Sequence, residues 1–274
     1  TSGLSPTAAL IFMSDRQVRF VPVADFFGTP GLLSVRLADA SSDLSAFLSA
    51  DATQTRVLAS AGGISGIGAW NAVTRTIGIQ ITAVNDRPTL APATLSVAED
   101  TTLPASQTVS ALFGSGYADA TDNQSGIPGS SSTAAAFAGL AIVGNAADAT
   151  TQGVWQYNDN AGSGWVTIGS GGSAPSDANA IVLATTAQLR FLPNVANYNG
   201  TPGSLTVRGA DSVQATATGV DLTTALALGQ ISTWSATTTL TATVTPVNDA
   251  PTMPQTAIPP YVSVTENAAT ASGQ

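Results

Sequence analysis

Oxygen-bearing side chains gather in a few short segments of this chain. Residues 85–86 and 248–249 are both Asn-Asp, and each pair stands two residues before a proline. Carboxylates and Asn carbonyls held on loops suit Ca²⁺, a hard cation that takes roughly six to eight oxygen ligands. The sequence therefore predicts calcium ligation. The candidate ligands are Asp39, Asn85, Asp86, Glu99, Asp100, Asp119, Asp122, Asp211, Asn248, Asp249 and Glu266.

Each candidate also has a simpler explanation. Asn and Asp favour turns for local reasons, so the pairs at 85–86 and 248–249 could serve only to end a strand before the proline. Glu99 could be a solvated strand end, and Asp119 and Asp122 could belong to a polar loop. The residue types alone leave ligation and these local roles open.

The residues of most catalytic sites are missing. The chain has no His and no Cys, which removes the commonest bases, nucleophiles and soft metal ligands. The two Glu residues, Glu99 and Glu266, are expected in different repeats and cannot form a facing pair. Residues 62–66 are rich in Gly but lack the Lys of a phosphate-binding loop. We expect a protein that is not an enzyme.

Charge and composition restrict the partners. The 274 residues carry a formal net charge of −9, and all eight basic residues are Arg. Such an acidic chain is a poor match for nucleic acid or an anionic membrane. No apolar run reaches the roughly 18 residues that span a bilayer, and the lack of Cys is compatible with an exported protein. Thr1 falls within a repeat, so we expect any targeting signal to lie outside this segment.

A long passage occurs twice, roughly 165 residues apart. Residues 19–22 (Arg-Phe-Val-Pro) return as 190–193 (Arg-Phe-Leu-Pro), and residues 28–31 (Gly-Thr-Pro-Gly) return as 200–203. Arrays of repeated domains usually serve reach and adhesion rather than chemistry. The predicted units are the C-terminal part of one repeat at 1–89, a complete repeat at 90–252, and the first strand of a third at 253–274.

Short segments of alternating polarity predict strands. Ile77, Ile79 and Ile81 alternate with small or polar residues, and later segments repeat the pattern. A period of two is typical of half-buried antiparallel strands, and many such strands at regular spacing suggest a sandwich. We therefore predict an all-β fold of tandem antiparallel β-sandwich domains. Residues 43–68 and 213–233 are long for connections, and we expect an extra hairpin or a short helix in each.

Aromatic and basic residues recur at matching positions. Trp70 and Trp234 are expected to pack in the core or under a loop, although an exposed pair could bind sugar together with Tyr198. Four Arg residues are expected on outward strand faces, as solvated residues that discourage edge pairing. They are Arg19, Arg36, Arg190 and Arg208.

The boundary motif Val-Asn-Asp-Xaa-Pro, at 84–88 and 247–251, resembles the linker of cadherin-like tandem repeats in giant bacterial surface proteins of the VCBS or RTX-adhesin type. Residues 96–100 and 263–267 resemble the Glu-bearing first strand of those repeats, and the resemblance covers nearly the whole chain. It implies Ig/cadherin-like sandwiches with Ca²⁺ at the junctions. By position, the first junction would use Asn85, Asp86, Asp119, Asp122 and Asp211, and the second would use Glu99, Asn248 and Asp249.

These observations lead to one functional expectation with two alternatives. We expect a structural or adhesive segment of an extracellular bacterial surface protein, an extended stalk stiffened by Ca²⁺ at its junctions. Its partners would be neighbouring repeats, like chains in a fibre or biofilm matrix, or cell-surface glycans. The alternatives are a self-assembling filament or sheath subunit that uses strand exchange, and a carbohydrate-binding module.

Overall fold

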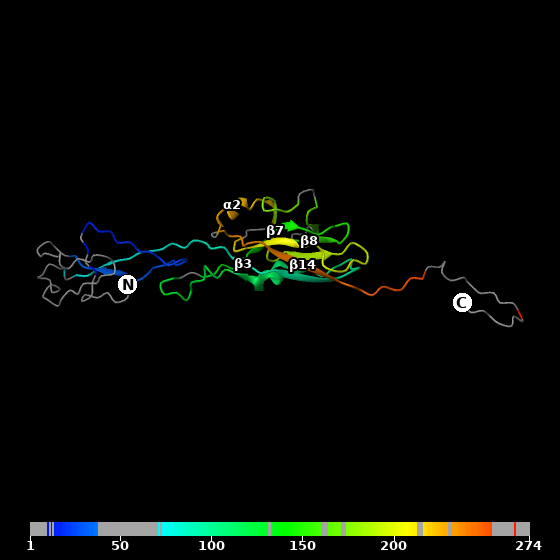
Figure 1. Ribbon diagram of the computed structural model, residues 1–274, viewed down its shortest axis with the longest axis horizontal. Helices are drawn as coiled ribbons and strands as arrows, with labels where there is room; N and C mark the ends of the chain where they lie inside the picture. The colour runs from blue at the N-terminus through cyan, green and yellow to red at the C-terminus, as the bar shows by residue number, and fades with distance from the viewer. Residues whose placement is uncertain are drawn as a thin grey trace.

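The structure is a computed structural model. It describes residues 10, 12, 14–37, 71, 73–130, 133–159, 164–170, 174–212, 216–229, 232–253 and 266. Figure 1 shows a central body of strands, with the described N-terminal residues at one end of it. The segment that follows β14 (Thr238–Thr245) leaves from the opposite end. The two Asn-Asp pairs therefore stand at opposite ends of the body.

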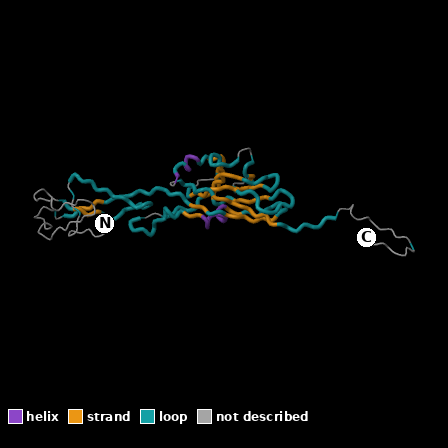
Figure 2. The backbone as a smooth tube through the Cα atoms, in the orientation of Figure 1, coloured by secondary structure: helices purple, strands orange, loops and turns teal. Residues whose placement is uncertain are grey.

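Strands dominate the body, as Figure 2 shows. The larger sheet has the order β13 (Ala217–Val220), β10 (Ala180–Ala184), β7 (Gly139–Asn145), β12 (Leu205–Ala210), β14, β4 (Ala93–Ala98). The second sheet has the order β5 (Gln107–Thr108), β11 (Gln188–Leu192), β8 (Val154–Asn158), β9 (Val166–Thr167). Two short pairs complete the set: β1 (Leu33–Val35) with β2 (Arg75–Ile77), and β3 (Thr89–Leu90) with β6 (Tyr117–Ala118).

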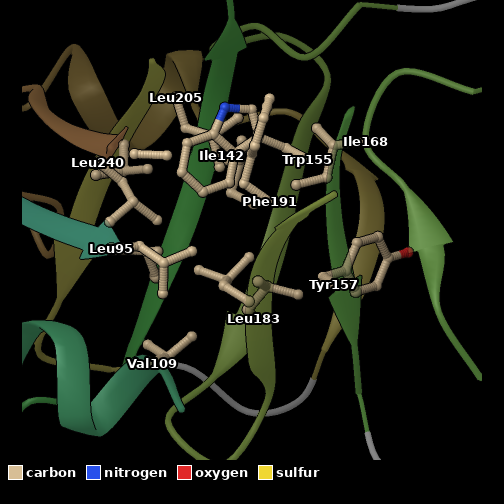
Figure 3. Close-up of a cluster of buried hydrophobic side chains, with 14 of the residues drawn as sticks. Leu95, Val109, Ile142, Trp155, Tyr157, Ile168, Leu183, Phe191, Leu205 and Leu240 are labelled. Carbon is tan, nitrogen blue, oxygen red and sulfur yellow. The ribbon is translucent and has the colours of Figure 1, made fainter. Parts of the chain in front are cut away.

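Both larger sheets contribute side chains to one hydrophobic core, which Figure 3 shows. In β14, Leu240, Ala242 and Val244 are buried while the residues between them are at least partly accessible, because strand side chains alternate between faces. Trp155 of β8 packs edge-on against Phe191 of β11, with ring centroids 5.2 Å apart. The predicted all-β class is confirmed.

One strand pair differs from the predicted antiparallel pattern. β14 and β4 run parallel, with Leu240 opposite Ala93 and Thr245 opposite Ala98. Parallel neighbours need a long connection between them. Here that connection is most of the body, since β4 and β14 lie near its beginning and its end. The antiparallel prediction is therefore wrong for this pair.

The internal repeat is visible in the backbone pairing. In β1 and β2, Leu33 lies opposite Ile77; in the corresponding strands β12 and β14, Leu205 lies opposite Leu240. A further bridge joins Gly28 to Ile81 in the first copy, and its counterpart joins Gly200 to Val244 in the second. The two passages thus adopt the same local pairing.

Two elements lie in segments that the sequence left uncertain. Residues 213–233 contain β13, which pairs with β10, and the short helix α2 (Thr223–Leu226). The short helix agrees with one of the two expectations, an extra hairpin or a short helix. Helix α1 (Val109–Phe113), followed by the 3-10 turn η2 (Gly114–Gly116), was not predicted. The five residues of α1 are too few to show a helical period, although the side chain of Thr108 caps its first turn by accepting from Ala111 N–H at 3.1 Å.

Some predictions concern residues outside the described set. They are the element at 43–68, Trp70, and the strand at 261–266 apart from Glu266. The predicted domain limits stay predictions. The two hydrophobic clusters of the described residues both fall between Leu90 and Val244, within the predicted complete repeat.

Candidate metal centre

Carboxylates from three parts of the chain meet at the first boundary. Asp86 lies in the linker before β3, Asp119 directly follows β6, and Asp211 directly follows β12. Because β3 pairs with β6, the linker runs beside the turn that carries Asp119 and Asp122. We call Asn85, Asp86, Asp119, Asp122 and Asp211 the first-junction cluster.

Hydrogen bonds tie the linker to the body within this cluster. The backbone N–H of Asp86 donates to Asp122 Oδ2 at 3.1 Å, and Asn85 Nδ2 donates to Asp211 Oδ2 at 2.9 Å. Both donors approach carboxylate oxygens, so each bond is charge-assisted. The structure therefore brings together all five residues that the sequence assigned to this junction. Their role as calcium ligands stays a prediction.

Asp119 has an unusual environment for a carboxylate. Its side chain is buried, with 3% of the residue exposed, and Oδ2 accepts one hydrogen bond from Ala135 N–H at 2.7 Å. Oδ1 is buried and has no hydrogen-bond partner among the described residues. A buried polar atom without a partner is costly, and a charged one more so. This oxygen is the strongest indication that the cluster accepts a ligand.

The carboxylates of the cluster also repel one another. Burial raises the pKa of Asp86, and the charges of Asp122, Asp25 and Asp119 raise it further. Burial likewise raises the pKa of Asp211, with added repulsion from Asp119 and Asp122, while the Asn85 hydrogen bond opposes the rise. The pKa of Asp119 is raised by burial and by Asp122, against the lowering effect of the Ala135 amide. A cation would relieve both causes.

Three further groups at this junction were not predicted as site residues. Asp25 is close enough to act on Asp86, and both line a hollow of about 600 Å³ together with Arg87. Arg87 Nε and the hydroxyl of Tyr117 are buried without a hydrogen-bond partner among the described residues. Burial, then repulsion from Asp119, raises the pKa of Tyr117.

The donor set fits a hard cation in its chemistry. It offers carboxylate and amide oxygens with no thiol or imidazole, and the ion pairs of the described residues, Arg16–Asp15 and Arg208–Asp177, do not involve it. The positions are not those of a finished site. Within the described ranges, no group of three or more acidic side chains is already arranged to hold a metal ion. Binding would require side-chain rotations that bring these oxygens to a common centre.

Glu99 marks the opposite end of the body, and its carboxylate is fully engaged. Only 4% of the residue is exposed. Oε1 accepts from Val247 N–H at 2.7 Å, and Oε2 accepts from Asn199 Nδ2 at 3.0 Å. Glu99 thus fastens the chain leaving β14 to the loop before β12. The simpler interpretation of a solvated strand end is wrong for this residue.

The other candidates near this end are more exposed. Asp100 accepts from Asn197 N–H at 3.3 Å. Asn248 Nδ2 donates to the carbonyl of Asp249 at 3.2 Å, as Asn85 Nδ2 does to the carbonyl of Asp86 at 3.1 Å, so the repeated motif makes the same local hydrogen bond. The structure forms no turn or bend at either pair, since the described residues 82–88 and 246–253 have neither. Glu266 is exposed, and Asp39 lies outside the described residues.

The Arg residues of the middle repeat are not solvated as predicted. Arg190 is 8% exposed, and its guanidinium stacks on Trp165 with Cζ 3.8 Å from the ring centroid. Arg208 makes a two-pronged ion pair with Asp177, at 2.8 and 2.9 Å. Flat guanidinium groups suit both contacts. The prediction was wrong because side-chain partners across strands cannot be read from alternation alone.

The aromatic residues offer little surface for sugar stacking. Trp234 is 7% exposed and belongs to the smaller hydrophobic cluster, in agreement with the expected packing role. Tyr198 is half-buried against the main core. Trp70 lies outside the described residues. Neither described side chain forms an open aromatic platform.

Comparisons with known proteins identify no relative. No family model matches the chain, and neither a curated protein nor a solved structure is similar to it. Among the described residues, no helix is both long and apolar enough to cross a membrane.

Proposed function

We propose that this chain is a structural or adhesive segment of an extracellular bacterial surface protein, an extended stalk whose junctions are stiffened by Ca²⁺. The observation that carries the proposal is the buried, unpartnered Oδ1 of Asp119 inside a cluster of mutually repelling carboxylates. Repetition of the same pairing in two passages supports a tandem array of Ig/cadherin-like units. The elongated outline in Figure 1 suits a stalk.

The cluster would work by charge neutralisation. Without a cation, Asp86 in the linker is repelled by Asp119 and Asp122 of the body, and this repulsion favours separation of the two parts. With Ca²⁺ bound, the same oxygens become ligands that attract a common centre. Since the ion binds only the closed arrangement, it stabilises that arrangement by mass action. The linker direction would then be fixed relative to the body.

The test compares the full chain in calcium and in chelator. We expect small-angle scattering to give a narrower range of shapes in Ca²⁺ than in EDTA, and thermal unfolding to move to higher temperature. At a free calcium concentration 100 times Kd, the stabilisation would be about 2.7 kcal/mol. Equal scattering curves and equal melting temperatures in the two buffers would contradict the proposal.

A pair of variants assigns the effect to the cluster. Asp86→Ala removes the linker carboxylate and leaves the hydrophobic core untouched, so it should weaken the calcium response. Asp221→Asn removes one charge from an exposed turn far along the chain and should leave the response intact. An equal calcium response in both variants would place the metal elsewhere.

A further inference from the structure

Two loops of this chain have nearly the same sequence and the same backbone form. The first loop, residues 25–31, reads Asp-Phe-Phe-Gly-Thr-Pro-Gly; the second loop, residues 197–203, reads Asn-Tyr-Asn-Gly-Thr-Pro-Gly. Their opening residues have φ of 60° and 58°, and Gly28 and Gly200 have φ of 120° and 124°. All four values lie where only Gly, Asn and Asp are common. The two loops are therefore equivalent in shape.

The first loop is docked on another loop of the body, residues 124–130. Phe27 N–H donates to Oε1 of the buried Gln124 at 3.3 Å, and Thr29 N–H donates to the carbonyl of Gly129 at 2.8 Å. The backbones touch so closely that a Cβ on Gly28 would lie 2.2 Å from Gly129 O. A Cβ on Gly129 would lie 2.4 Å from Thr29 O. Only a pair of glycines permits this contact.

The second loop presents the same glycine to open space. No atom lies within 4 Å of the position a Cβ on Gly200 would take, and Gly200 and Thr201 are exposed. The bridge from Gly200 to Val244 places this loop at the end of the body from which residues 246–253 leave. The Asn-Asp-Xaa-Pro motif follows there, as it follows the first loop at the other junction. The loop, its bridge to the last strand of the repeat and the motif that follows are thus repeated, whereas the covering loop is present only at the first junction.

We propose that the second loop is a docking surface for residues 124–130 of a further copy of the repeat 90–252, joined after the second Asn-Asp-Xaa-Pro motif. The contact uses two hydrogen bonds from the loop backbone, one to the Gln124 side chain and one to the Gly129 carbonyl, together with glycine packing, and contains none of the predicted metal ligands. It therefore goes beyond calcium binding, and it would set the angle between successive units both with and without bound calcium. Covalent linkage supplies the high local concentration that so small a contact needs.

The experiment uses a tandem chain in which residues 1–252 are followed by a second copy of residues 90–253. Since the chain has no Cys, spin labels can be placed at introduced cysteines. The first junction is measured with Gln80→Cys and Ser110→Cys. The second is measured with Thr243→Cys of the first copy and Ser110→Cys of the second. All three positions are exposed, and Thr243 corresponds to Gln80 in the repeat.

We expect distance distributions of similar mean and width at the two junctions. Gly200→Val in the first copy should broaden only the second junction, and Gly28→Val only the first. Gly129→Val in the second copy should reproduce the Gly200→Val effect from the other side of the contact, which separates docking from local strain. A broad second junction with Gly200 intact, or a second junction that ignores both of its valines, would overturn the proposal. The calcium function is tested separately, by comparing the same tandem chain, without the valine substitutions, in calcium and in chelator.

Discussion

The two ends of the body use buried carboxylates in opposite ways. At the far end, Glu99 meets two neutral donors, and both of its oxygens are bonded within the protein. At the first junction, Asp119 shares its surroundings with other carboxylates, and one of its oxygens has no partner among the described residues. A buried acid is stable when donors surround it and unstable when acids do. The comparison separates a structural fastening from a site that gains by taking up a cation.

The largest effect is expected from breaking the fastening. Glu99→Ala leaves Val247 N–H and the Asn199 amide without their acceptor, at a cost of about 1–3 kcal/mol for each donor that stays buried. Urea unfolding of the full chain should show this loss in chelator as well as in calcium. A loss that occurs only in calcium would make Glu99 a metal ligand, as the sequence predicted.

The neighbouring residue provides the control for this variant. Asp100 is exposed and accepts one longer bond of 3.3 Å from Asn197 N–H. Its φ of 58° is tolerated by Asn, so Asp100→Asn keeps both the backbone form and an acceptor. We expect its stability to lie within about 0.5 kcal/mol of the natural chain.

A smaller effect, of opposite sign in the two buffers, is expected at Asp119. Asp119→Asn removes a buried charge and its repulsion of Asp86 and Asp211. In chelator the variant should therefore unfold at a higher temperature than the natural chain, by the equivalent of about 1 kcal/mol. In calcium it should lose most of the stabilisation by the ion. A variant that is less stable in both buffers would show that the charge itself serves the fold.

The sequence predicted the repetitive parts of this structure well and the unique parts poorly. Alternation located β12 and β14, and the doubled passage indicated a repeated unit, although the pairing of Leu33 with Ile77 and of Leu205 with Leu240 was not predicted. Such patterns are local, or are copied along the chain, and can be read without coordinates. The parallel pairing of β4 with β14 depends on the closure of the whole body, which no local pattern reports.

The same division applies to the candidate site. The scarcity of acidic residues singled out the first-junction residues, and the resemblance to cadherin-like repeats assigned them to one junction by position. The full burial of Glu99 and the stacking of Arg190 on Trp165 were not predicted, because each depends on a partner from a distant segment. Residue type indicates what a side chain could bind. Only packing decides whether the protein itself already supplies that partner.

The smallest effect concerns the pH dependence of the first junction. The folded-state pKa values of Asp86, Asp119 and Asp211 are all raised above the ordinary value of 3.8. The folded state therefore binds more protons than the unfolded state over a window that begins near 3.8 and extends upward. The free energy of unfolding in chelator should rise as the pH falls from neutrality into that window. Below the window these groups are protonated in both states and should cause no further change.

In calcium the same titration should act in the other direction. Protons compete with the ion for the carboxylates, so lowering the pH through the window should reduce the stabilisation by calcium. Thermal unfolding of the full chain at a series of pH values gives the slope of melting temperature against pH, once in calcium and once in chelator. Asp119→Asn should flatten both slopes. The Asp221 carboxylate has a lowered pKa and lies outside the cluster, so Asp221→Asn should change the sign of neither slope. Parallel slopes in the two buffers would mean that calcium does not bind these carboxylates.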